Sequence, residues 1–226
     1  MDDANRRAWV ELSLRGVPSQ ALVALLQAFG SPAAVLEARA AQRTAIANVE
    51  SALAAPAPAA LGVTLDWLSE PGHDLLAWDD PRYPAALLEL GHAPPVLYVM
   101  GQVDILARPA LAIVGSRNPT PQGVDNARAF ARALSGAGVA IVSGLAAGID
   151  GAAHEGALEG PGSTVGVMGT GLDRVYPARH RELAHAIAAR GLLLSEFPPG
   201  TPARDYHFPP RNRLTSGPAR GVLVAA

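Results

Sequence analysis

The chain has 226 residues, of which 49% are hydrophobic and 17% charged, and its net charge is −2. This length allows one or two domains with a substantial core. The sequence contains no apolar stretch long enough to span a membrane and no signal-peptide pattern, so we expect a globular, cytoplasmic protein without a membrane anchor. The absence of cysteine excludes disulfides, a thiolate nucleophile and cysteine-bound zinc.

The basic residues are concentrated toward the C-terminal end. Residues 1–109 contain 7 arginines and 12 acids, residues 110–173 contain 3 and 5, and residues 174–226 contain 8 and 3. The last segment therefore carries a local charge of +5 (8 minus 3) although the whole chain is slightly acidic. All 18 basic residues are arginines, whose planar guanidinium groups suit phosphate oxygens and stack on bases.

Residues 1–70 are expected to form a small all-α domain. The stretches RRAWVELSLRG, SQALVALLQAFG and SPAAVLEARA each have helix length. Gly16 and Gly30 can adopt the positive φ of a helix C-cap, and Ser19 and Ser31 are suitable N-caps. The Ala/Pro-rich run SALAAPAPAALG cannot continue as a helix past its prolines, so we expect a flexible joint or loop there.

Residues 71–226 are expected to form an α/β domain with a parallel, helix-covered sheet. Apolar runs of strand length recur 24 to 29 residues apart and begin at Leu111, Val139, Ser163, Leu192 and Gly221. Helix-length segments separate them, the first with Thr120 as N-cap and Pro121 in its first turn. This spacing is typical of βαβ units, whose strands are buried on both faces. The proline-rich lead-in at 73–102 is expected to add an edge strand and a loop.

The loops after the strands are rich in glycine and serine, and ligands bind at this end of a parallel sheet. The loops are Gly115-Ser116-Arg117, Ser143 to Gly148, Gly169-Thr170-Gly171 and Ser195 to Gly200. Backbone N–H groups of such loops can approach an oxyanion closely, and a helix starting near Gly148 would add its positive end. Turn geometry alone accounts for glycine at strand ends. It does not account for Arg117, which needs an anionic partner, so the sequence predicts an arginine-lined phosphate site.

Common cofactors do not match these loops. An NAD site needs a glycine-rich turn after the first strand and an acid after the second, but Arg117 and Ser143 stand in the corresponding regions. A Walker-type ATPase is excluded because the chain has no lysine. The six histidines include no pair at metal-ligand spacing. We therefore expect neither a cofactor nor a metal.

The segment RDYHFPPRNR at 204–213 alternates aromatic rings with arginines. Rings that stack on unpaired bases, beside guanidinium groups that hold phosphates, are typical of single-strand binding. As a bare pattern, the segment is equally consistent with a surface loop that plugs Phe208 into the core. Its position after the fourth strand favours binding, because it can fold over the loops that hold Arg117.

No catalytic set can be assembled from the sequence. His154 lies four residues after Asp150, which would permit acid–base chemistry, but we favour a structural role in which His154 orders the helix start. Asp173 and Glu196 are possible acids, yet no serine–histidine–acid constellation accompanies them. We assign no catalytic residue.

Five motifs, in their order and spacing, resemble the DNA-processing protein A (DprA/Smf) family. They are AIVGSRNPT, IVSGLAAGIDGAAHEGAL, VMGTGLDRVYP, LLSEFPPGT and FPPRNR. The lead-in is similar to that family's extension of its core, and the N-terminal helices resemble its sterile-alpha-motif-like or helix-hairpin-helix domain. The resemblance implies an extended Rossmann-like parallel sheet with helices on both faces over residues 71–226, preceded by the helical module at 1–70.

The resemblance also implies a non-enzymatic, cytosolic protein that receives single-stranded DNA in natural transformation, protects it and helps load RecA recombinase. The full-length protein would be a homodimer. Carried over motif by motif, the DNA pocket would use Gly115, Ser116, Arg117, Ser143, Gly144, Gly148, Arg204, Phe208, Arg211, Asn212 and Arg213.

Two features depart from the family's pattern. After the last motif the chain reads Leu214-Thr215-Ser216-Gly217-Pro218, which is expected to shorten that helix. The sequence also stops at Ala226, within an expected core strand, where relatives continue. We therefore expect a missing C-terminal part that holds most of the dimer and RecA surfaces.

Two other classes of function compete with this interpretation. Lysine-decarboxylase-like nucleoside-monophosphate phosphoribohydrolases have a related core, but they carry PGGxGTxxE with a catalytic glutamate. The nearest string here runs from Gly160 to Thr164 and no glutamate follows it. A purely structural partner-binding protein would have no affinity for nucleic acid.

Overall fold

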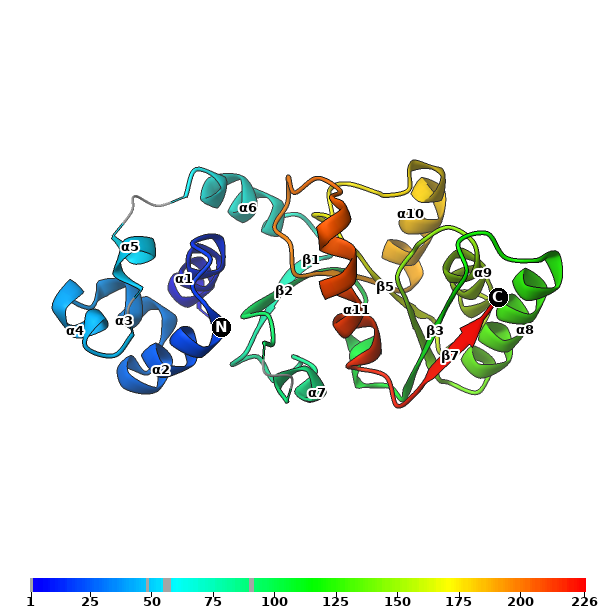
Figure 1. Ribbon diagram of the computed structural model, residues 1–226, viewed down its shortest axis with the longest axis horizontal. Coiled ribbons are helices and arrows are strands. Elements are labelled where there is room, and N and C mark those ends of the chain that lie inside the picture. The colour runs from blue at the N-terminus through cyan, green and yellow to red at the C-terminus, as the bar shows by residue number, and fades with distance from the viewer. Residues whose placement is uncertain (1, 48, 55–57, 90–91) are drawn as a thin grey trace.

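The computed structural model describes residues 2–47, 49–54, 58–89 and 92–226. Figure 1 shows a group of helices at the N-terminal end beside a sheet that carries further helices. The N-terminal helices are α1 (Asp3–Leu14), α2 (Ser19–Phe29), α3 (Pro32–Glu37), α4 (Ala40–Thr44), α5 (Glu50–Leu53) and α6 (Ala60–Leu68).

The predicted helix ends in this region are largely confirmed. Gly16 and Gly30 have φ of 65° and 82°, and the Ser31 side chain accepts a hydrogen bond from the backbone N–H of Ala34. The prediction for Ser19 was wrong. Pro18 holds the N-cap position of α2, while the Ser19 hydroxyl donates to the Ala93 carbonyl, 3.0 Å away. Part of the expected Ala/Pro-rich joint, residues 55–57, lies outside the described residues.

The described residues contain a seven-stranded sheet in the order β1-β2-β6-β5-β4-β3-β7. Its strands are β1 (His73–Ala77), β2 (Val96–Gly101), β3 (Ala110–Gly115), β4 (Ala140–Ser143), β5 (Thr164–Val167), β6 (Leu192–Ser195) and β7 (Val222–Ala225). The run from β6 to β7 is parallel, as predicted. The lead-in supplies two antiparallel strands, β1 and β2, where one edge strand was expected.

Helices cover both faces of the sheet, which confirms the predicted α/β class. The segments between strands form α7 (Ala85–Leu88), α8 (Pro121–Gly136), α9 (Ile149–Ala157), α10 (Arg181–Arg190) and α11 (Phe208–Ser216). Ile113 and Ile141 pack in a core with residues of α8 and α9. On the other face, Val142 packs in a core that includes Leu214 of α11. Alternate strand residues face opposite sides, so the two cores share the same strands.

The N-terminal helices pack on the first two strands. Trp9 of α1 makes an edge-on contact with Trp78, with ring centroids 6.1 Å apart, and Arg6 pairs with Asp74 at 2.8 Å. The division of the chain into domains at residue 70 stays a prediction. None of the helices in the described part of the chain combines the length and apolar character that crossing a membrane requires.

Candidate nucleic-acid interface

Two adjoining cavities lie where β3 and β4 end. The smaller, which we call the Phe208 cavity, has a volume of about 150 Å³ and is lined by Arg117, Gly144, Ala146, Ala147, Tyr176, Pro177, Arg179, Phe208 and Arg211. The larger, the β3-end cavity, has a volume of about 440 Å³ and also contains Gly115, Ser116 and Asn212. Both include Arg117 and Arg211. Strand-end loops and the helix α11 therefore bring predicted residues from three motifs together.

Phe208 has a guanidinium group near its ring from each of two arginines. The Cζ atoms of Arg117 and Arg211 are each 5.9 Å from the ring centroid, and the ring of Tyr176 lies 5.5 Å away. Phe208 is half-buried, and a Cβ atom at Gly169 would come within 2.9 Å of it. The ring therefore packs on the protein and also lines the cavity, and its stacking on an unpaired base stays a prediction.

Arg211 is a buried cation. It is only 5% exposed, and its Nε atom has no hydrogen-bond partner among the residues that the structure describes. Burial lowers the pKa of Arg211, while the nearby carboxylate of Asp150 opposes that shift. A buried guanidinium with an unsatisfied N–H is costly. An anion that enters the cavity would relieve part of that cost.

Asp150 connects this arginine to the loop after β4. Its Oδ2 atom accepts hydrogen bonds from the backbone N–H groups of Gly144 and Ala146, both at 3.2 Å. Burial raises the pKa of Asp150, and these hydrogen bonds and Arg211 oppose the rise. The carboxylate thus orders the loop and faces the cation.

The GSR loop and the start of α9 approach each other closely at a glycine. Gly148 has φ of 82°, and a Cβ atom there would lie 2.4 Å from the carbonyl oxygen of Ser116. The backbone N–H of Ile149 donates to that same carbonyl at 3.2 Å. The predicted helix start near Gly148 is confirmed, and it places the positive end of α9 beside the β3-end cavity.

Four predicted residues line neither cavity: Gly148, described above, and Ser143, Arg204 and Arg213. Ser143 is buried and its hydroxyl donates to the Ile113 carbonyl at 2.6 Å, which ties β4 to β3. Arg213 forms a largely buried ion pair with Glu196. Arg204 is exposed and donates to the Tyr206 hydroxyl at 2.5 Å.

Two residues that line the Phe208 cavity, Tyr176 and Arg179, were missed from the sequence. Tyr176 belongs to the VYP end of the third motif, and Arg179 to the basic C-terminal segment, so both signals were present. The two acids considered for catalysis have other contacts. Glu196 pairs with Arg213, and Asp173 accepts a hydrogen bond from the Gly200 N–H at 2.8 Å.

His154 has a structural role, but not the one predicted. Its ring is fully buried and forms a 2.7 Å hydrogen bond with the Thr164 hydroxyl at the start of β5. Asp150, not His154, bonds to the loop at the start of α9. Burial lowers the pKa of His154 to about 3, which keeps the ring neutral. Within the described ranges, no three histidine or acidic side chains gather to form a metal site.

The sequence is similar to those of known proteins. Residues 74–226 match the model of the family described as DNA recombination-mediator protein A. Protein Smf of Synechocystis is 47% identical over 150 residues, covering 65% of this chain and 38% of the relative. The putative DNA processing protein DprA of Mycobacterium tuberculosis is 36% identical over 242 residues, covering 99% of this chain and 61% of the relative.

Solved structures give the same result. The structure of DprA from Streptococcus pneumoniae matches with a TM-score of 0.76 and 32% identity, covering 96% of this chain and 77% of that one. A Helicobacter pylori structure, described as showing the single-stranded DNA binding mode of its DNA processing protein A, matches with a TM-score of 0.62 and 33% identity over 67% of this chain and 68% of that one. The chain spans 38% and 61% of the two curated relatives named above. It belongs to the DNA recombination-mediator protein A family.

Proposed function

We propose that this protein binds single-stranded DNA in the Phe208 cavity and the adjoining β3-end cavity. The observation that carries the proposal is the Phe208 ring with the guanidinium groups of Arg117 and Arg211 both 5.9 Å from its centroid. Aromatic rings beside guanidinium groups hold unpaired bases and phosphates together. The Helicobacter pylori relative supports the assignment, because its structure is described as showing single-stranded DNA binding.

Binding of this kind depends weakly on base sequence. Backbone N–H groups and guanidinium groups contact phosphates, which carry no sequence information. A stacked base contributes roughly 1–3 kcal/mol whatever its identity, because every base presents a π-face. The affinity falls with salt, with a log–log slope of about −0.7 for each phosphate neutralised.

The wider role rests on the family. We propose that the full-length protein protects incoming single-stranded DNA in the cytoplasm during natural transformation, helps load RecA recombinase and acts as a homodimer. They are proposed from the family, since this chain spans 61% of the length of its Mycobacterium tuberculosis relative.

We propose binding without catalysis. The string from Gly160 to Thr164, the nearest match to the phosphoribohydrolase segment, leads into the amino end of β5. The two cavities lie at the carboxyl ends of β3 and β4, the opposite edge of the parallel sheet. The string nearest to the phosphoribohydrolase segment therefore lies at the wrong edge of the sheet to supply a catalytic glutamate beside the cavities. Release of ribose phosphate from AMP or CMP would contradict this part of the proposal.

Fluorescence anisotropy with labelled oligo-dT, duplex DNA and mononucleotides tests the function. The parent protein is expected to bind oligo-dT tightly and mononucleotides weakly. Arg117→Ala and Arg211→Ala are expected to lose at least about tenfold in affinity, as the loss of a charge-assisted contact predicts. Arg132→Ala, on the outside of α8 and 63% exposed, is the matched control. Unchanged binding by both cavity variants would overturn the proposal.

A further inference from the structure

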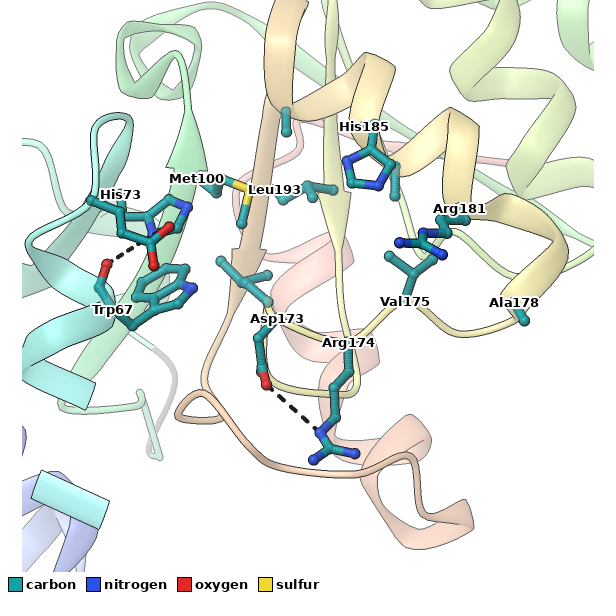
Figure 2. Close-up of a pocket in the computed structure, with 14 residues that line it drawn as sticks. Trp67, His73, Met100, Asp173, Arg174, Val175, Ala178, Arg181, His185 and Leu193 are labelled. Carbon is teal, nitrogen blue, oxygen red and sulfur yellow. Dashed lines mark hydrogen bonds and ion pairs between the residues drawn. The ribbon is translucent and has the colours of Figure 1, made fainter. Parts of the chain in front are cut away.

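A third cavity, which we call the α10 cavity, is larger than the two described above. It has a volume of about 700 Å³, which lies within the range of ligand sites. Figure 2 shows it between Trp67 and His73 on one side and the helix α10 on the other. Met100 and Leu193 contribute apolar surface from strands β2 and β6. Such a surface accepts the flat face of a base.

The α10 side of this cavity carries one cationic side chain, Arg181. Arg181 and His185 are four residues apart on α10 and therefore share one face of the helix, and both are exposed and line the cavity. In the part of the chain that the structure describes, Arg181 has no carboxylate within ion-pair distance. It is also the first residue of α10, where the positive end of the helix disfavours a cation and favours an anion.

Two carboxylates line the same cavity, but neither neutralises Arg181. The Asp173 side chain accepts a hydrogen bond from the Gly200 N–H at 2.8 Å and lies 3.7 Å from the Nε atom of Arg174. Glu70 is 64% exposed and 3.9 Å from the ring of His73, and His73 lies across the cavity from α10. The positive charge of the α10 side is therefore available to a ligand.

A single segment, residues 172–181, which runs through a short 3-10 helix to the first residue of α10, lies between the α10 cavity and the Phe208 cavity. Tyr176, Pro177 and Arg179 of this segment line the Phe208 cavity. Their neighbours Val175, Ala178 and Arg181 line the α10 cavity. A polymer held beside Phe208 would have to pass over this segment to reach the α10 cavity. Arg179 lines the Phe208 cavity and Arg181 lines the α10 cavity, so each side of the segment has an arginine.

We infer that the α10 cavity is a second subsite for single-stranded DNA, occupied by the part of the strand that continues beyond the Phe208 cavity. Arg181 and His185 hold its phosphates, and the apolar surface at Met100 and Leu193 accommodates a base. This inference rests on the proposed function, since it needs a strand in the Phe208 cavity. It adds that the strand continues from the Phe208 cavity toward α10, and that the binding site is longer than the first two cavities.

The test compares a short and a long oligo-dT, of about 5 and about 15 nucleotides, by fluorescence anisotropy. The short one is expected to occupy the Phe208 cavity and the adjoining β3-end cavity, and the long one to reach the α10 cavity as well. Arg181→Glu is expected to lower the affinity for the long oligonucleotide about tenfold and to leave the affinity for the short one unchanged. Arg181→Ala is expected to have an intermediate effect. The salt slope for the long oligonucleotide falls by about 0.7 for each phosphate contact that is lost. The matched control is Arg190→Glu, which changes an exposed arginine at the other end of α10 that does not line the cavity.

Each outcome has one meaning. Loss confined to the long oligonucleotide in Arg181→Glu, and absent in Arg190→Glu, supports the second subsite. Equal affinity of Arg181→Glu and the parent for the long oligonucleotide overturns it and leaves the proposed function intact. Equal losses in the two glutamate variants also overturn it, because they reflect net charge alone. If the parent binds neither oligonucleotide, the proposed function itself fails.

Discussion

The guanidinium group of Arg211 packs directly against the backbone of Gly144. A Cβ atom at position 144 would lie 1.5 Å from the Nη1 atom of Arg211, far inside any permitted contact. The loop after β4 thus accepts the arginine of α11 only because residue 144 has no side chain. This contact sets the position of the buried cation in the proposed DNA site.

The first prediction concerns Gly144→Ala. The added methyl group must displace the Arg211 side chain, so affinity for oligo-dT is expected to fall at least about tenfold, as it does when a charge-assisted contact is lost. Overpacking at this buried position also lowers the free energy of unfolding by about 1–3 kcal/mol. Anisotropy and thermal melting measure the two effects. Gly136→Ala is the control, because a Cβ atom there meets nothing within 4 Å. Normal binding by Gly144→Ala would show that the position of Arg211 is unimportant.

The second prediction separates Arg213 from Arg211. Arg213 and Glu196 form an ion pair with side chains 20% and 14% exposed, and removing one member of such a pair leaves the other charge uncompensated. Arg213→Ala and Glu196→Gln are therefore each expected to lower the free energy of unfolding by about 2–3 kcal/mol. Because Arg213 lines neither proposed DNA cavity, affinity for oligo-dT in the folded variants is expected to stay within about twofold of the parent.

Denaturant unfolding measures the stability of the Arg213→Ala and Glu196→Gln proteins, and anisotropy measures their affinity for oligo-dT. Arg211→Ala provides the contrast, because its main effect is expected on DNA affinity. A large loss of affinity in a fully folded Arg213→Ala protein would assign Arg213 to DNA contact, as the family resemblance does.

These two arginines also show what the sequence could and could not predict. Periodic apolar runs gave the parallel strands, and Thr120 caps α8 as expected, its hydroxyl accepting from the Gly123 N–H. The FPPRNR motif indicated that Arg211 and Arg213 were important. Residues two apart on a helix point in different directions, so only the docking of α11 decides which one faces the cavity.

The antiparallel strands β1 and β2 illustrate the same limit. Their apolar runs were visible in the lead-in, but strand length and hydropathy do not reveal the direction of pairing. That direction follows from tertiary contacts such as the register of Tyr98 with Ser195. The wrong N-cap prediction for Ser19 has a similar cause. The Ser19 hydroxyl donates a hydrogen bond to the carbonyl of Ala93, which is distant in sequence.

The third prediction concerns stacking on Phe208. Phe208→Ala is expected to reduce the affinity for oligo-dT by about 1–3 kcal/mol, the contribution of one stacked base. Phe208→Leu keeps apolar volume against Gly169 and so separates packing from stacking. Anisotropy measures affinity, and a melting curve shows whether each variant is folded. Phe130→Ala removes an aromatic ring that is 55% exposed on α8 and is expected to bind normally. If Phe208→Leu bound as well as the parent, the ring would not stack on DNA.

The fourth prediction is a pH dependence of stability caused by His154. Burial lowers the pKa of His154 from 6.5 to about 3, with smaller contributions from His180 and Arg211. At neutral pH the ring is uncharged in the native and unfolded states. As pH falls below 6.5 the unfolded chain binds a proton that the native protein cannot, so stability is lost progressively down to about pH 3. The full loss from this one group is on the order of 5 kcal/mol.

Denaturant unfolding between neutral pH and about pH 4 measures this loss as a difference between the parent and His154→Gln. The variant is expected to be less stable at neutral pH, because the hydrogen bond to Thr164 is disturbed, but to lose less stability on acidification. His185→Gln removes an exposed imidazole and serves as the control for the substitution. Because Asp150 and Glu196 are retained in all three proteins, their titration cancels in the comparison. Parallel curves for the parent and His154→Gln would show that His154 is not the group that destabilises the protein in acid.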